Sequence, residues 1–224
     1  MTSREFRERA GRRARKAGLR LEAALTQKLE EYYQLLSRWN QKINLTAFNL
    51  EDGTDEVFDR LLIEPLAAAR FLPPEAVRWV DIGTGGGSPA IPLKLAAPTL
   101  SLTMVEAKTR KSAFLREAVR RLDLFASVVE NARFEELLAR PDMHERAGVV
   151  TIRAVRIETR TLLALQAFLR PGGELWLFRG PSGPDSPSTV PPPLSWQSTH
   201  PLLESTRSRL VVLHKAVESP LASL

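Results

Sequence analysis

The sequence of 224 residues contains no cysteine and only three histidines. Without cysteine the chain cannot form disulfides, thiolate metal sites or iron–sulfur clusters, and it has no thiol nucleophile. The histidines, His144, His200 and His214, are separated in the sequence and lack the spacing of metal ligands. We therefore expect no metal site.

Long apolar runs are also missing. No uninterrupted apolar stretch approaches the roughly 20 residues of a membrane-spanning helix. The arginine-rich N-terminus has no apolar core or small-residue cleavage site, so we identify no secretory signal. Hydrophobic residues make up 43% and charged residues 26% of the chain, which is ordinary for a globular protein. We expect a cytoplasmic protein with one well-buried domain, a helical extension and no membrane partner.

Positive charge is concentrated at the start of the chain. The formal net charge is +6, and residues 1–20 account for all of it, because they hold eight basic side chains against Glu5 and Glu8. The basic residues are Arg4, Arg7, Arg9, Arg12, Arg13, Arg15, Lys16 and Arg20. Such an arm attracts nucleic acid phosphates and releases their counterions. A solvated, frayed helix without a partner is the alternative that the sequence leaves open.

Two segments after this arm show helical periodicity. Apolar residues recur at three- and four-residue steps at Leu21, Leu25, Leu29, Tyr32 or Tyr33, Leu36 and Trp39, which predicts an amphipathic helix. A second helix is predicted over residues 57–72 and ends before Pro73 and Pro74. We therefore predict a helical extension over residues 21–74.

From residue 75 the period changes, and short apolar runs rich in β-formers alternate with helical segments. The predicted strands are "VRWVDI", "LSLTMVE", "ASVVEN", "GVVTIRA" and "GELWLF". Five strands separated by helices predict a doubly wound α/β domain, over residues 75–224, with a mostly parallel sheet. The proline- and serine-rich residues 181–201 predict an extended loop. Residues 208–217 predict a last strand, whose pairing direction the sequence does not determine. An antiparallel strand at the edge of the sheet would be consistent with doubly wound sheets.

The stretch "VDIGTGGGSP", residues 80–89, predicts a glycine loop between a strand and a helix. Gly83, Gly85, Gly86 and Gly87 allow the backbone to turn sharply and to approach a ligand closely. Pro89 suits the first turn of the following helix. A tight turn without a ligand is the alternative interpretation.

Two acidic residues flank the loop. Asp81 ends the first strand, and Glu106 ends the second, 19 residues beyond Gly87. Glu106 can accept hydrogen bonds from both ribose hydroxyls. A dinucleotide would favour glycine at position 88, where the chain has Ser88, and Asp81 would suit the ammonium group of S-adenosylmethionine better than a pyrophosphate. These residues favour S-adenosylmethionine, and a nicotinamide-dependent oxidoreductase remains an alternative.

Here the sequence resembles the RsmG (GidB) family, bacterial 16S ribosomal RNA guanine-N7 methyltransferases. The loop "DIGTGGGSPAIPL" is similar to the cofactor loop of that family. Four further matches follow in the family's order: "RWNQKINLTA", "KTRKSAFLREAVRRLDL", "NARFEEL" and "TIRAV". The resemblance covers about Leu21 to Lys215 and implies a Rossmann-like class I methyltransferase fold.

The resemblance implies methyl transfer from S-adenosylmethionine to N7 of a guanosine in the decoding-region loop of 16S rRNA. It places Gly83 and Ser88 against the cofactor, and Phe134 and Glu135 against its adenine, with core packing as the alternative for Phe134. It places Arg153 beside the cofactor, where the guanidinium could orient guanine. A plain ion pair is the alternative for Arg153. N7 carries a lone pair and no proton, so no general base is expected.

Basic residues near these motifs are candidates for RNA contact. They are Lys42 with Asn44 in the segment before the core, and Lys108, Arg110 and Lys111 after the second strand. Each could instead be a solvated surface charge. The expected partner is ribosomal RNA or the small ribosomal subunit, and we expect the protein to act as a monomer.

The chain departs from the family's usual "RHxxDS" signature, which appears here as "RLLIEP". Arg60 remains, whereas Leu61, Glu64 and Pro65 replace the signature residues, and Ser88 stands where the family has a bulky apolar side chain. These departures leave open a second hypothesis, a catalytically silent or retargeted RNA-binding relative of the same fold.

Overall fold

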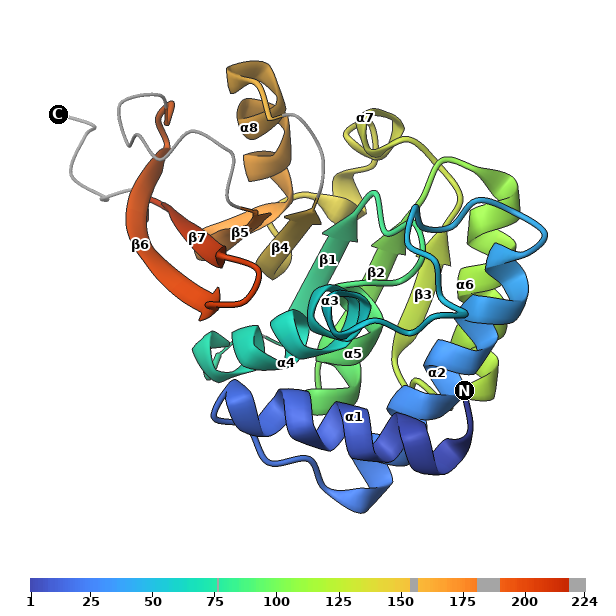
Figure 1. Cartoon of the computed structure of the whole chain (residues 1–224). Coiled ribbons are helices and arrows are strands. Elements are labelled where there is room, and N and C mark those ends of the chain that lie inside the picture. The colour runs from blue at the N-terminus through green and yellow to red at the C-terminus, as the bar shows by residue number, and fades with distance from the viewer. Residues whose placement is uncertain (76, 154–156, 181–189, 218–224) are drawn as a thin grey trace, which may run out of the picture.

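The computed structural model describes residues 1–75, 77–153, 157–180 and 190–217. Within these residues the chain forms one seven-stranded sheet in the order β3-β2-β1-β4-β5-β7-β6 (Figure 1). β1 to β5 are parallel, and β7 is antiparallel to both neighbours. The bounds are β1 (Arg78–Ile82), β2 (Ser101–Val105), β3 (Ser127–Glu130), β4 (Ala147–Arg153), β5 (Leu169–Arg179), β6 (Leu194–Leu203) and β7 (Ser208–Lys215). The predicted doubly wound, mostly parallel sheet is confirmed.

Helices cover the sheet and extend it at the N-terminal side. They are α1 (Ser3–Lys16), α2 (Ala23–Asn40), α3 (Asp55–Phe58), α4 (Glu64–Ala68), α5 (Ala90–Ala96), α6 (Thr109–Arg121), α7 (Phe134–Leu137) and α8 (Thr159–Leu165). A π-helical turn, Asp59–Ile63, joins α3 to α4, so residues 55–71 run as one helical segment where the sequence predicted a helix over residues 57–72. Pro65 is the second residue of α4, directly after the π-helical turn, and because it has no N–H it makes no backbone hydrogen bond to the preceding turn.

The predicted loop over residues 181–201 is wrong at its end. Residues 181–189 lie outside the described part, but β6 begins at Leu194 and pairs with β7. β6 is the edge strand, and an edge tolerates Pro201 because one side of the strand has no ladder to complete. The last predicted strand, β7, is antiparallel but lies inside the sheet between β5 and β6.

The basic N-terminal segment is not a frayed helix. α1 begins with a capping box between Thr2 and Glu5 and buries Phe6, Ala10 and Ala14 along one face. Phe6 packs on Tyr33 and Phe58, with ring centroids 5.6 and 5.1 Å apart. The boundaries predicted at residues 20 and 74 stay a prediction, but α1 packs onto the helical extension.

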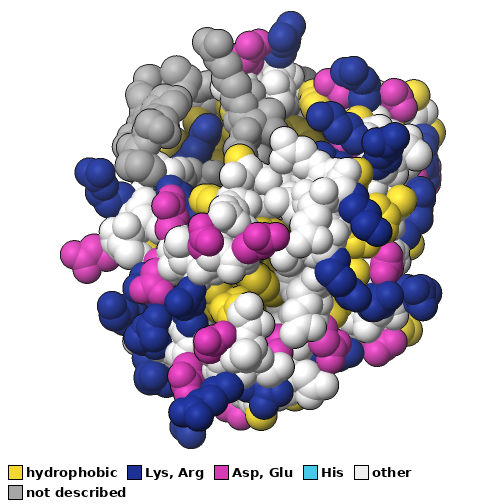
Figure 2. All heavy atoms as spheres, turned by 45° about the vertical axis from the view of Figure 1, so that its right-hand side comes forward, with side chains coloured by type: hydrophobic (Ala, Val, Ile, Leu, Met, Phe, Trp, Pro, Cys, Tyr) yellow, Lys and Arg dark blue, Asp and Glu magenta, His cyan; other side chains and the backbone are white. Residues whose placement is uncertain are grey.

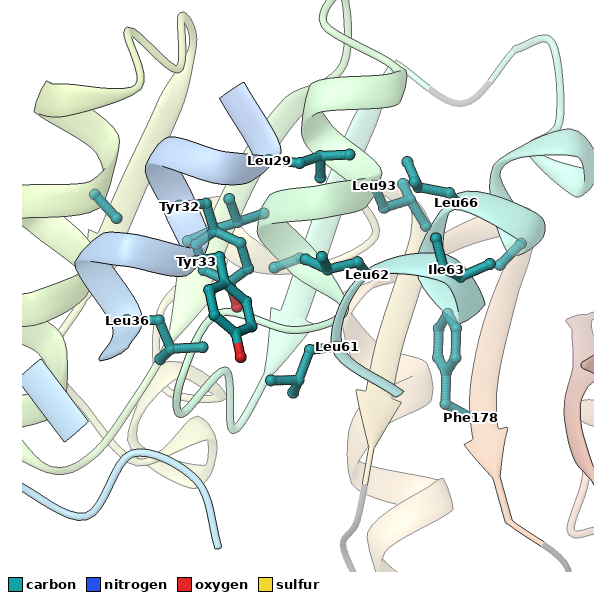
Figure 3. Packing of buried hydrophobic residues seen from close by; sticks show 14 of the residues in the cluster. Leu29, Tyr32, Tyr33, Leu36, Leu61, Leu62, Ile63, Leu66, Leu93 and Phe178 are labelled. Carbon is teal, nitrogen blue, oxygen red and sulfur yellow. The ribbon is translucent and has the colours of Figure 1, made fainter. Parts of the chain in front are cut away.

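Two clusters of buried side chains lie on opposite faces of the sheet. One joins α1, α2, α5 and α6 to the strands, and the other joins α7 and α8 to them. Figure 3 shows the first cluster, in which Tyr32 and Leu36 of α2 face Leu61 and Leu62 of the π-helical turn. Because strand side chains alternate between faces, Asp81, Thr151 and Arg153 all point toward this cluster. The alternation brings polar residues from separate strands to one place.

Candidate functional site

The glycine loop joins β1 to α5. Gly83, Gly85 and Gly87 have positive φ angles of 69°, 57° and 92°, which side-chain-bearing residues rarely adopt. A Cβ on Gly87 would lie 2.5 Å from Ile91 Cδ1, so this position also needs glycine for space. The Tyr32 hydroxyl donates a 2.7 Å hydrogen bond to the carbonyl of Gly86. Tyr32 therefore supports the loop, a role that its helical spacing did not reveal.

Asp81 is buried beneath the loop and is 1% exposed. Thr151 on β4 donates a hydrogen bond to Asp81 Oδ1, and Trp79 Nε1 donates to the Thr151 hydroxyl over 2.8 Å. Asp81 Oδ2 has no hydrogen-bond partner within the described chain. Burial raises the pKa of Asp81 to about 6, although the hydrogen bond from Thr151 opposes this shift.

Glu106 organises the backbone around the loop. Its two carboxylate oxygens accept hydrogen bonds from the backbone N–H groups of Gly85, over 2.9 Å, and of Lys108, over 2.8 Å. Asn131 of the segment after β3 donates to the Glu106 carbonyl over 3.1 Å. Each carboxylate oxygen has a second acceptor site, so the ribose contact predicted for Glu106 is compatible with these bonds and stays a prediction.

Arg153 at the end of β4 lies in a network that crosses three elements. Its Nη1 donates to the Arg60 carbonyl over 2.6 Å and to Ser88 Oγ over 3.1 Å, and its Nη2 pairs with Glu64 Oε2. Ser88 Oγ in turn donates to the Leu61 carbonyl over 3.0 Å. The guanidinium is 5.8 Å from the Phe178 ring centroid. Burial lowers the pKa of Arg153, and the charge of Glu64 opposes the change.

Glu64 is the centre of this network and its side chain is 2% exposed. Besides Arg153 it accepts hydrogen bonds from Arg60 Nη1, over 3.2 Å, and from the Thr206 hydroxyl, over 2.7 Å. Thr206 lies in the turn between β6 and β7. Glu64 and Ser88, both departures from the family signature, are thus joined to Arg153 in one network.

A cavity of about 590 Å³ opens beside the loop and this network. Of the predicted cofactor residues, Gly83, Gly85, Ser88 and Arg153 line it, and so does the predicted RNA residue Lys111. Phe178 and the segment from Leu45 to Phe48 close other sides. Its volume lies within the usual range for small-molecule sites, about 300–1,000 Å³.

Other predicted residues lie off the cavity wall. Gly87 belongs to the loop but not to the lining, and Asp81 and Glu106, which lie against the loop, are not in the lining either. Phe134 begins α7, is half-buried and packs on the cluster beneath α7 and α8, whereas Glu135 is exposed. The adenine contact of this pair stays a prediction. The alternative interpretation of Phe134, as a packing residue, is supported by its contact with this cluster.

The remaining candidates for RNA contact are surface residues. Lys42, Asn44, Lys108 and Arg110 are exposed. Figure 2 shows Lys and Arg side chains gathered on two sides of one face, with mostly uncharged atoms between them. The segment that carries Lys42 and Asn44 is held by a residue that sequence reasoning missed: Asn40 Oδ1 accepts from the backbone N–H groups of Leu45, over 2.9 Å, and Thr46, over 3.0 Å.

Two further features are absent from the described part of the chain. No group of three or more His, Asp or Glu side chains is arranged to hold a metal ion in that part of the chain. None of the helices described is both long and apolar enough to span a bilayer.

Comparison with known proteins relates this geometry to a family. The family model GidB, described as rRNA small subunit methyltransferase G, matches residues 25–189. A ribosomal RNA small subunit methyltransferase G of Carboxydothermus hydrogenoformans is 39% identical over 165 residues, which cover 73% of this chain and 68% of the relative. Its counterpart in Xanthomonas axonopodis pv. citri is 34% identical over 198 residues, which cover 86% and 88%.

Solved structures share the fold at low sequence identity. A SAM dependent methyltransferase from Aquifex aeolicus superposes with a TM-score of 0.52 at 14% identity, covering 71% of this chain and 92% of that one. The putative methyltransferase yhhF from Escherichia coli gives 0.54 at 16% identity, covering 69% and 87%. This likeness identifies the fold as that of class I methyltransferases.

Proposed function

The chain belongs to the GidB family, rRNA small subunit methyltransferase G, and from this membership we propose that it methylates N7 of a guanosine in the decoding-region loop of 16S rRNA. The methyl donor is S-adenosylmethionine. The observation that carries the proposal is the cavity where the glycine loop, Ser88 and Arg153 meet. A small-molecule donor and a nucleotide base must meet in such a cavity for methyl transfer.

The residues around the cavity fit S-adenosylmethionine. The backbone of Gly83 and Gly85 is open to close approach by a ligand, and the unpartnered Asp81 Oδ2 behind the loop suits an ammonium group, directly or through water. Ser88 would contact the cofactor, Glu106 its ribose, and Phe134 with Glu135 its adenine. When bound, S-adenosylmethionine supplies an electrophilic methyl group on its sulfonium.

The acceptor chemistry suits the side chains that line the cavity. N7 of guanine has an exposed lone pair and needs no general base, so the protein has to align the base and exclude water. A guanidinium has five N–H donors, and the bonds of Arg153 to Arg60, Ser88 and Glu64 use three of them. The two that remain can orient the guanine through its acceptor oxygen.

Exposed basic residues around the cavity would hold the RNA strand. Lys111 lines the cavity itself, and Lys108 and Arg110 precede it near the start of α6. Lys42 and Asn44 lie in the segment whose residues Leu45 and Thr46 also line the cavity. Phosphate contacts from these side chains would position the target nucleotide without reading its sequence. The protein would act as a single copy in the cytoplasm.

Nucleoside analysis tests the acceptor position. The purified chain is incubated with S-adenosylmethionine and small-subunit rRNA or subunits from a strain without this gene, and the digested RNA is analysed by mass spectrometry. We expect 7-methylguanosine, and strong loss of it with Arg153→Met but not with Arg160→Met, an arginine 85% exposed on α8. A different methylated nucleoside would refute the N7 assignment.

Calorimetry distinguishes the alternative function. Glu64 already pairs with Arg153, which is the observation that favours a silent RNA-binding relative. An active enzyme binds S-adenosylmethionine with measurable heat. Absence of binding heat, together with retained RNA binding, would support the silent relative instead.

A further inference from the structure

A second cavity, of about 860 Å³, lies between α1 and the first turns of α2. We propose that this α1–α2 groove binds the phosphate backbone of RNA at a site separate from the catalytic cavity. The groove is lined by Arg7, Gly11, Arg15, Leu19, Arg20, Leu21, Ala23, Ala24, Thr26 and Gln27. The proposal rests on the proposed function in one respect, namely that the substrate is RNA.

Six of the eight basic residues of the N-terminal segment fall into two sets, and the other two, Arg4 and Arg7, pair with Glu8 and Glu30. The first set holds α1 in place: Arg13 is 7% exposed and forms ion pairs with Asp59 and, over 3.2 Å, with Asp55. Arg12 and Arg9 also reach Asp55, over 3.1 and 3.9 Å. These three charges are used within the fold.

The second set has no such role. Arg15, Lys16 and Arg20 are exposed, and no ion pair or hydrogen bond of their side chains is found within the described residues. Arg15 and Arg20 line the groove, where Arg15 Nη1 lies 3.4 Å from the position that a Cβ on Gly11 would take. Positive side chains that stabilise nothing in the fold remain available to an external anion.

The charged side chains that line the groove are all basic. The groove contains three arginines and no acidic residue, although Arg7 pairs with Glu30 over 3.3 Å. The amino end of α2, which is 18 residues long, lies in the groove. Its first turn has no acidic residue, and its N-cap is the exposed Glu22, whose side chain makes no capping hydrogen bond. The N–H groups of this first turn and the helix dipole add positive potential, which the charge of Glu22 opposes, so the attraction for an anion comes mainly from the arginines. A chain of phosphates is the ligand that this arrangement favours.

The position of the groove separates it from the chemistry. Figure 1 shows α1 across the end of the molecule where β1 and β2 begin, whereas the glycine loop follows the opposite end of β1. The family match begins at residue 25, so most of the groove precedes the segment shared with the family. The groove would bind RNA remote from the target guanosine, and its loss would raise KM without changing kcat.

Fluorescence anisotropy with a labelled single-stranded RNA tests the groove. The variant is Arg15→Gln/Arg20→Gln in the full chain, and the matched control is Arg4→Gln/Arg160→Gln, which removes two exposed charges outside the groove. Each phosphate contact contributes about 0.7 to the slope of log affinity against log salt, so the variant should lower that slope by about 1.4. If the variant and wild type bind the RNA equally at 1 M salt, this difference in slope makes the affinity of the variant roughly 25-fold weaker than that of wild type at 0.1 M salt.

Three outcomes of the RNA measurements would overturn the proposal: a wild type that does not bind the RNA, a variant whose salt slope matches that of wild type, or a control that loses as much affinity as the variant. Loss of binding to phosphatidylserine vesicles with unchanged RNA binding would assign the groove to membranes and equally overturn it. Failure of the proposed function has a different signature, since it would abolish methyl transfer by wild type while leaving the anisotropy difference intact. Calorimetric affinity for S-adenosylmethionine should be the same in all three proteins.

Discussion

Replacing Asp81 with asparagine should change how stability depends on pH. Burial raises the pKa of Asp81 from 3.8 to about 6, and each pKa unit corresponds to 1.36 kcal/mol between the two protonation states. The folded chain therefore binds a proton that the unfolded chain releases between about pH 4 and pH 6. Stability falls as pH rises through this window, and ionised Asp81 costs about 3 kcal/mol above it.

Urea unfolding from pH 4 to pH 8 measures this cost. An asparagine cannot ionise, so the stability of Asp81→Asn relative to wild type should rise by about 2 kcal/mol between pH 4 and pH 7, because part of the effect is already present at pH 4. Its buried amide leaves an N–H without a partner, which costs about 1–3 kcal/mol at every pH. The pH dependence of the difference, rather than its absolute size, is therefore the informative quantity.

Binding of S-adenosylmethionine provides the second readout for Asp81. Ionised Asp81 would attract the ammonium group, so wild-type affinity should increase as pH rises through about 6, whereas the variant should bind weakly throughout. Asp123→Asn serves as control, because that carboxylate is 83% exposed. A stability difference that is equal at pH 4 and pH 8 would refute the reasoning about burial.

Three further substitutions test packing and charge. Glu64→Gln removes the negative charge that Arg60 and Arg153 share. Thermal unfolding should show a loss of stability of about 2–3 kcal/mol, and KM for RNA should rise. An unchanged melting temperature would contradict this role of Glu64. Arg13→Met leaves the buried Asp59 with the hydroxyl of Ser205 but without its charged partner. Urea unfolding should therefore show a loss of stability of about 3–5 kcal/mol, and a loss under about 1 kcal/mol would count against the buried pair. The Cβ introduced by Gly87→Ala would meet Ile91. Gly18 also has a positive φ angle, but a Cβ introduced there by Gly18→Ala would have no atom within 4 Å, so that variant is the matched control. Calorimetric melting should therefore show that Gly87→Ala loses about 1–3 kcal/mol more stability than Gly18→Ala, and equal losses of stability would exclude the steric argument.

Local patterns were enough to predict the α/β class, the glycine loop and the acids that flank it. Strand and helix periodicity report which side chains are buried, and that signal is local in the sequence. Asp81 and Glu106 lie at the carboxyl ends of predicted strands, so their place beside the loop could be inferred from the common edge of parallel strands. The family resemblance, confirmed by the comparisons, depended on the same ordered motifs.

Contacts between distant segments were decided only by the tertiary structure. The segment that leads into β6 is rich in proline and serine, which hid the strand in the sequence, and residues 194–203 form a strand because β7 offers them an edge to pair with. The eight basic residues of the arm look alike in sequence, yet Asp55 and Asp59, more than 40 residues away, engage some of them and leave Arg15 and Arg20 free. Likewise, Glu64, Ser88 and Arg153 meet only because a π-helical turn, a loop and a strand end converge. Periodicity along the chain determines which face of an element is buried, whereas the partner of each polar side chain depends on packing between elements.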